Sequence, residues 1–197
     1  MRANRTTLKH RIAILASGAG SNAKRIIEYF QNAENISINL VASNKADAGV
    51  LDIAVAKHID TYLLNTSNFK KSDEFLNELK KREITFVVLA GFLLQVPENL
   101  TRAYHNKMVN IHPALLPAYG GKGMYGHFVH EAVHAAGEKE SGITIHFVNE
   151  HYDEGEIVFQ AKAPIAPTDG PSEIESKVRA LEIEHFAPTI ERILNNL

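Results

Sequence analysis

The chain alternates between short apolar segments and segments whose apolar residues recur at helical spacing. The apolar segments predict strands at residues 11–16, 36–42, 62–64, 85–90 and 108–111. The segments between the first four of them predict helices at residues 22–31, 49–57 and 72–81, the last with Ser72 as a candidate N-cap. Because residues 85–90 contain a continuous apolar run, we expect that strand to be buried on both faces.

The remaining part of the chain has a different order of elements. Residues 113–126 are rich in Gly, Pro and Tyr and predict a long loop, whereas residues 127–136 predict a helix. Strands are predicted at 143–148 and 157–165 with only a polar connection between them, and a helix from Ser172 to the chain end. The whole pattern predicts an α/β fold with a doubly wound, mostly parallel, Rossmann-like sheet and a mixed or antiparallel C-terminal part.

Composition narrows the class of protein. The 197 residues are 45% hydrophobic and 22% charged, which is typical of a globular chain that can bury a core. Lys and Arg number 21 against 23 Asp and Glu, so the net charge of −2 argues against non-specific nucleic-acid binding. No apolar run approaches the roughly 20 residues that cross a bilayer, and cysteine is absent. We expect a cytoplasmic monomer or homodimer, with residues 1–10 as a flexible tail and 11–197 as one domain.

The loop after the first predicted strand is a candidate anion site. Gly18 and Gly20 allow close backbone approach, and the helix that follows offers free N–H groups and positive potential. The spacing up to Ala23 also fits a loose dinucleotide fingerprint, but no acidic residue stands at residues 43–45 to hold a ribose. A single phosphate monoester is therefore the better hypothesis, and a simple glycine turn is the alternative.

Asn110 and His112 end a predicted strand, where alternation points both side chains to the same side. An amide donor beside an imidazole suits the stabilisation of an oxyanion. Asp153 lies in the polar connection between the last two strands, and a carboxylate next to an imidazole raises its pKa. The alternatives are a packed histidine at the strand end and an ordinary turn residue in the connection.

A second motif points to different chemistry. His130, Glu131 and His134 match the His-Glu-x-x-His pattern of zinc peptidases, in which two histidines one helical turn apart chelate the metal. The third ligand of one zinc-peptidase class is missing, because Glu140 stands where that class has a histidine. We interpret the segment as a surface helix with scattered histidines and expect no metal.

Several segments in this order resemble the phosphoribosylglycinamide formyltransferases, a family of folate-dependent formyltransferases. The segments that carry the resemblance are residues 18–22, 43–48, 87–92, 110–117 and 142–148, followed by the Asp153 connection. Together they cover about residues 10 to 195. The family transfers the formyl group of 10-formyltetrahydrofolate to the amine of phosphoribosylglycinamide in purine biosynthesis.

The resemblance implies a role for individual residues. Those that would hold the phosphate and ribose of the acceptor are Gly20, Ser21, Asn22 and Glu182. Those that would line the folate pocket are Leu93, Leu94, Gln95, Val96 and Asn110. The catalytic residues would be Asn110, His112 and Asp153. The amine would attack the formyl carbon directly, Asn110 and a protonated His112 would stabilise the oxyanion, and Asp153 would keep His112 charged near neutral pH, without a metal.

Two departures from the family and several other functions stay open. The loop at residues 118–126 is longer than the common family version. Some family members use an arginine near the folate tail, and residues 70–73 of this chain contain no match for it. Another folate-dependent formyltransferase or a deformylase is an alternative, although such relatives carry further domains that we do not expect here. From other classes, a zinc peptidase and a non-catalytic nucleotide-binding module remain.

Overall fold

The computed structural model describes residues 10–197, which form one mixed sheet of seven strands in the order β3-β2-β1-β4-β5-β6-β7. The strands are β1 (His10–Leu15), β2 (Ile36–Ser43), β3 (Asp60–Leu63), β4 (Phe86–Leu89), β5 (Met108–His112), β6 (Glu140–Phe147) and β7 (Ile157–Pro164). The first five are parallel, whereas β6 pairs antiparallel with both β5 and β7. The predicted fold class is thereby confirmed.

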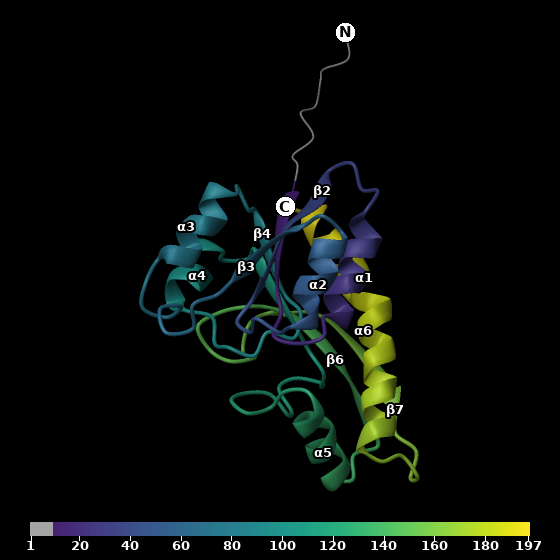
Figure 1. The fold of residues 1–197 in the computed structure, drawn as a ribbon. Helices are drawn as coiled ribbons and strands as arrows, with labels where there is room; N and C mark the ends of the chain where they lie inside the picture. Colours follow the sequence, from purple (N-terminus) through teal and green to yellow (C-terminus); the bar gives the residue numbers. More distant parts are fainter. Residues whose placement is uncertain (1–9) are drawn as a thin grey trace.

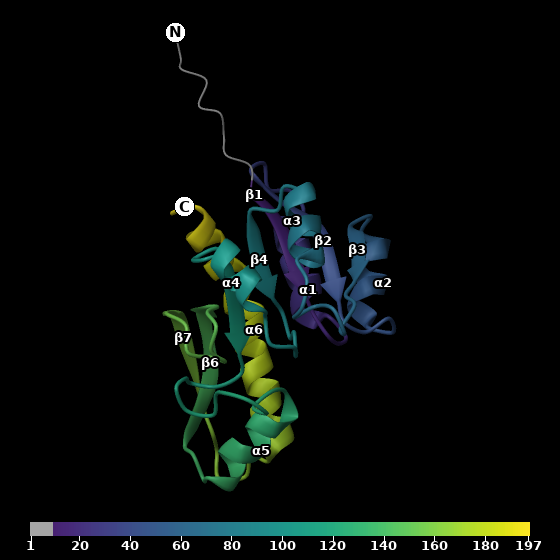
Figure 2. The same ribbon diagram turned by 90° about the vertical axis from the view of Figure 1, so that its left-hand side faces the viewer.

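Helices cover both faces of the sheet (Figure 1; Figure 2). They are α1 (Ser21–Phe30), α2 (Gly49–Ala56), α3 (Glu74–Lys81), α4 (Glu98–Ala103), α5 (His127–Ala135) and α6 (Pro171–Leu194). Two buried apolar clusters result, one beneath α1, α2, α5 and α6 and the other beneath α3 and α4. Strand β4 contributes side chains to both clusters. Phe86 and Val88 belong to the first cluster, and Val87 and Leu89 belong to the second. Its uninterrupted apolar sequence follows from burial on both faces.

The boundaries differ from the sequence predictions in a few places. Helix α3 begins at Glu74 with Asp73 as its N-cap residue, one residue later than predicted, and the Ser72 hydroxyl accepts a hydrogen bond from the N–H of Glu74 at 3.4 Å. Helix α4 was missed because its six residues are too few for a periodic pattern. Of the expected tail, residues 1–9 lie outside the described residues, and His10 begins β1 opposite Ile36.

The topology creates a crevice at one edge of the sheet. The chain passes from β1 outward to β2 and β3 and then returns to β4 on the other side of β1. In such sheets the crevice at the carboxyl ends of the two strands beside this reversal is the usual ligand site. Helix α6 packs on α1, α5, β6 and β7, so it joins the parallel part of the sheet to the antiparallel part.

The close approach of β6 and β7 yields a first prediction. A Cβ atom on Gly142 would lie 2.0 Å from the carbonyl oxygen of Ala161 and 2.7 Å from Leu115 Cδ2. Gly142→Ala should therefore destabilise the fold by about 1–3 kcal/mol or more, the usual cost of overpacking. Gly18→Ala is the control, because nothing lies within 4 Å of the added methyl group. Equal urea midpoints for the two variants would contradict the packing of this strand pair.

Candidate active site

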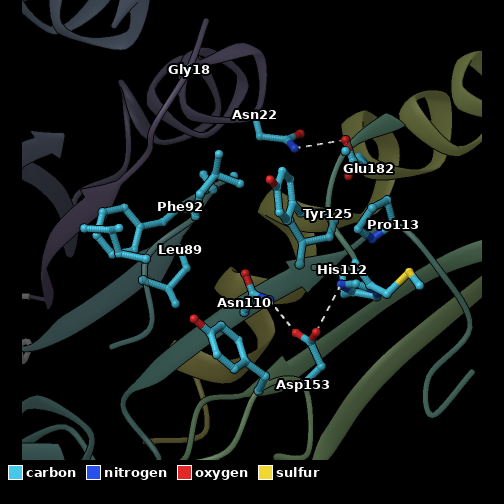
Figure 3. Close-up of a pocket in the computed structure, with 18 of the residues that line it drawn as sticks. Gly18, Asn22, Leu89, Phe92, Asn110, His112, Pro113, Tyr125, Asp153 and Glu182 are labelled. Carbon is cyan, nitrogen blue, oxygen red and sulfur yellow. Dashed lines mark hydrogen bonds and ion pairs between the residues drawn. The ribbon is translucent and has the colours of Figure 1, made fainter. Parts of the chain in front are cut away.

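A cavity of about 690 Å³ opens at the carboxyl ends of β1, β4 and β5 (Figure 3). This volume is within the range of small-molecule sites. Its walls come from five regions of the chain, namely residues 18–22, 89–96, 110–113, 121–126 and 146–153, together with His130 of α5 and one face of α6. All the residues to which the family resemblance gave a role line this one cavity.

The loop before α1 has the shape expected of an anion site. Gly20 adopts a left-handed conformation with φ 81°, and an added Cβ would lie 2.7 Å from the side chain of Val50. Glycine is therefore required here by conformation and by contact. No acidic residue stands in the first turn of α1 and no side chain caps it, so its N–H groups are available to a ligand.

Helix α6 supplies the opposite wall of this end of the cavity. Glu175, Val178, Arg179 and Glu182 share one helical face and all line the cavity. Asn22 donates a hydrogen bond to Glu182 at 3.0 Å, and burial raises the pKa of Glu182. The hydrogen bond from Asn22 and the positive charge of Arg179 partly offset this rise. The sequence analysis missed Arg179, although its spacing from Glu182 on one helix face would have indicated it.

Strands β5 and β6 position the polar groups at the centre of the cavity. Asn110 lies opposite His146 in the antiparallel pairing, and its Nδ2 is 3.2 Å from His146 Nε2. The other ring nitrogen of His146 donates to the carbonyl oxygen of Phe147 at 2.8 Å. The sequence analysis did not assign His146 a role, but alternation on β6 would have placed it beside Asn110.

The Asp153 carboxylate lies between these groups and is nearly buried. One oxygen accepts the N–H of Gly121 at 2.9 Å and lies 3.6 Å from His112 Nδ1. The other lies 3.5 Å from Asn110 Nδ2 and 3.6 Å from His146 Nε2. Burial alone would raise the pKa of Asp153, but His146, His112 and the Gly121 N–H outweigh it and the pKa is lowered. Asp153 is thus a carboxylate at neutral pH.

The backbone around Asp153 is shaped to bring the carboxylate inward. Asp153 has a left-handed conformation with φ 58°, which is uncommon for a residue with a side chain. Two residues later, an added Cβ on Gly155 would lie 1.7 Å from the carbonyl oxygen of Phe147. Only glycine lets this connection lie so close to β6. Strain at one residue and contact at the other are characteristic of a functional site.

His112 is held from both sides of its ring. Nε2 lies 2.7 Å from the carbonyl oxygen of Tyr119, and Nδ1 faces Asp153. Because a carbonyl only accepts, the Nε2 proton is directed to Tyr119. Burial lowers the pKa of His112 more than Asp153 and Tyr119 raise it. The expectation that Asp153 keeps His112 charged near neutral pH is therefore wrong, because the ring is only 3% exposed.

The residues expected to line a folate pocket form the segment after β4. Leu93 donates its N–H to Ser17 Oγ at 2.9 Å, and Ser17 in turn donates to Asn44 at 2.6 Å. The N–H of Leu94 makes no hydrogen bond to residues 10–197, whereas the N–H of Gln95 is directed to the hydroxyl oxygen of Tyr152. The Gln95 side chain is already bound, since it accepts from Lys70 at 2.9 Å and donates to the carbonyl oxygen of Glu150 at 3.3 Å.

The histidines of α5 do not form the predicted alternative, a zinc centre. His130 is buried, whereas His134, one turn later, is exposed. Among residues 10–197 no three histidine, aspartate or glutamate side chains are grouped so that they could hold a metal. The interpretation as surface histidines holds for His127 and His134 and is wrong for His130, which lines the cavity.

Comparison with known proteins agrees with this arrangement. A family model described as "Formyl transferase" matches residues 10–190. The chain belongs to the formyl transferase family.

Its formyl transferase relatives include a chloroplastic phosphoribosylglycinamide formyltransferase of Arabidopsis thaliana, which is 39% identical over 90% of this chain. This chain spans 62% of that relative's length. The phosphoribosylglycinamide formyltransferase of Haemophilus influenzae is 36% identical over 92% of this chain and 85% of the relative. The crystal structure of the enzyme of that name from Anaplasma phagocytophilum superposes with a TM-score of 0.86 at 30% identity, covering 95% of this chain and 88% of the other.

The electrostatics of His112 yield a second prediction. In this formyl transferase Asp153→Asn should lower the pKa of His112 further, because the variant removes the charge that partly offsets burial. NMR titration of the ring should give a lowered pKa in the wild type and a still lower one in the variant. A higher pKa of His112 in the variant would contradict the assignment of Asp153 as its charge partner.

Proposed function

We propose that the chain transfers the formyl group of 10-formyltetrahydrofolate to the amine of phosphoribosylglycinamide. The observation that carries the proposal is that one cavity contains an anion site at the start of α1, the group of Asn110, His112 and Asp153, and the open segment after β4. A phosphate-bearing acceptor and a folate donor entering from opposite ends would meet at the central polar groups. The names of the two relatives support this choice of substrates.

The acceptor is assigned to the end formed by α1 and α6. Its phosphate would receive hydrogen bonds from the N–H groups of Gly20, Ser21 and Asn22, with Arg179 as the counter-charge. Its ribose hydroxyls would bind Glu182. The amine then reaches the carboxyl end of β5, where Asn110 and His112 lie.

The donor is assigned to the segment after β4. The free N–H group of Leu94 would bind the polar edge of the pteridine ring, beside the N–H of Gln95 that is directed to Tyr152. Leu93 and Val96 provide apolar contact, and Leu93 is 41% exposed toward solvent. The 10-formyltetrahydrofolate is a co-substrate, and the proposal involves no metal.

The chemistry requires one bond to form, one to break and one proton to move. The neutral amine attacks the formyl carbon, and the bond from that carbon to the folate nitrogen then breaks. Negative charge builds on the formyl oxygen, and the Asn110 amide donates a hydrogen bond to it. The amide is available because its contact with Asp153 is long, at 3.5 Å, and therefore weak. Neutral His112 receives the amine proton through a water, and Asp153 stabilises the resulting imidazolium. The same proton then passes to the folate nitrogen.

We further propose that residues 11–197 act as one catalytic domain, as a monomer or homodimer in the cytoplasm. Among residues 10–197 no helix has the length and apolarity to cross a membrane. The proposed chemistry does not depend on the location or on the oligomeric state, because one chain supplies all the proposed groups.

Formyl transfer in a purified assay tests the proposal. The chain should convert both substrates to formylated acceptor and tetrahydrofolate, and Asp153→Asn should abolish most of that activity. The activity should survive chelation and the change His134→Ala. Peptidase activity that is lost on removing stoichiometric zinc would favour the alternative through His130, Glu131 and His134. Tight nucleotide binding without transfer would favour a non-catalytic module.

The anion site can be tested by introducing a negative charge into the first turn of α1. Ser21→Asp should raise the apparent KM for the acceptor about tenfold or more, because the carboxylate repels the phosphate. Folding should not suffer, since an acidic residue in a first helical turn is favourable by about 0.3–1 kcal/mol. Ser172→Asp places the same charge in the first turn of α6, away from the cavity, and should change neither KM. Equal effects of Ser21→Asp on both substrates would remove the phosphate assignment.

The catalytic roles of Asn110 and His112 can be tested by comparing the two single variants with the double variant. Asn110→Ala should lower kcat about 10²–10³-fold, the usual loss for one oxyanion donor. His112→Ala should lower kcat about 10²–10⁴-fold, the usual contribution of a general base. The double variant should lose far less than the product of the two factors, because both groups act on one intermediate. Losses that multiply would contradict joint action on that intermediate. KM values for both substrates are the control and should change little.

A further inference from the structure

His130 occupies an inward position on α5 that the proposed chemistry does not use. It lies on the buried face of the helix with Val129 and Val133, and it is 3% exposed. The other histidines of this helix, His127 and His134, are exposed. His130 also lines the cavity, so its ring is both buried in the protein and adjacent to the ligand space.

The ring of His130 has no hydrogen-bond partner within the described chain. Its Nδ1 is fully buried without a partner, and neither ring nitrogen makes a hydrogen bond to residues 10–197. By contrast, both ring nitrogens of His112 and of His146 face polar atoms. An unpaired buried polar group lowers stability, and an apolar residue beside the two valines would avoid that cost.

The surroundings of His130 define the chemistry that would suit it. Burial lowers the pKa of His130, while Glu175 raises it and His127 and His112 lower it. The ring is therefore neutral near neutral pH and offers one donor and one acceptor. Glu175 lines the same cavity and already accepts from His127, with 3.2 Å between the atoms. A neutral imidazole beside a carboxylate suits a ligand group that is uncharged and polar.

We propose that His130 binds the acceptor ribonucleotide through an uncharged oxygen, a ribosyl hydroxyl or the carboxamide. The inference rests on the proposed function and adds a residue to its acceptor site. Glu175, Arg179 and Glu182 share one face of α6 along the cavity, and an acceptor held at Arg179 and Glu182 lies along that face. Helix α5 packs on α6, and His130, Glu175 and His112 line the same cavity within range of one another's charge. This places His130 between the phosphate end and the reacting amine.

The test compares two changes at His130 with one on the exposed face of the same helix. His130→Leu should raise the apparent KM for the acceptor about 3- to 10-fold, the effect of one lost hydrogen bond. The KM for the folate donor should stay the same, and the Tm should rise because the unpaired group is gone. His130→Gln keeps a donor and an acceptor and should recover part of the acceptor affinity. His134→Leu should leave both KM values unchanged.

Ribose 5-phosphate as a competitive inhibitor distinguishes the two sources of the oxygen. Weaker inhibition of His130→Leu than of the wild type assigns the contact to the ribosyl hydroxyls, and equal inhibition with a raised acceptor KM assigns it to the carboxamide. An unchanged acceptor KM in His130→Leu overturns the inference, as does a fall in Tm with equal rises in both KM values. If His130→Leu does not fold, an acceptor KM in His130→Gln equal to that of His134→Leu overturns it. A wild-type chain without formyl transfer refutes the proposed function itself, which separates the two failures.

Discussion

The buried carboxylate of Asp153 is the constraint on which the rest of the site depends. A buried charge is tolerated only when polar partners surround it, and here they come from the loop after β5, from β5 itself and from β6. To provide them, the chain places Asp153 in a left-handed conformation and brings Gly155 against Phe147. The antiparallel pairing of β5 with β6 then aligns Asn110 with His146 on the same side. The mixed part of the sheet therefore builds the reactive centre.

The parallel part of the sheet supplies the binding ends of the cavity. The reversal of strand order between β1 and β4 leaves the start of α1 and the segment after β4 on either side of one crevice. Ser17 connects the loops that follow β1, β2 and β4 by accepting from Leu93 and donating to Asn44. Because these loops are held together, the start of α1 and the segment after β4 line the same cavity as the central carboxylate.

Local patterns in the sequence gave part of this arrangement, and tertiary packing decided the rest. The apolar run of β4 and the alternation that sets Asn110 beside His112 are properties of a single strand and are legible without a structure. From the residues alone Asp153 was one candidate carboxylate beside an ordinary turn residue, and the family resemblance gave it a catalytic role, because its position depends on a turn. The direction of the His112 pKa shift was expected wrongly, since burial depends on segments distant in sequence. His130 was taken for a surface residue for the same reason, because its helix packs against α6.

The account's central claim is direct transfer between two ligands in one cavity. A single turnover with a carbon-13-labelled formyl group on the folate, followed by NMR and by mass spectrometry of the protein, tests it most directly. We expect the label to pass from the folate nitrogen to the acceptor amine, with tetrahydrofolate formed in equal amount and no label on the protein. Label released as formate, or bound to a side chain before it reaches the acceptor, would contradict the account.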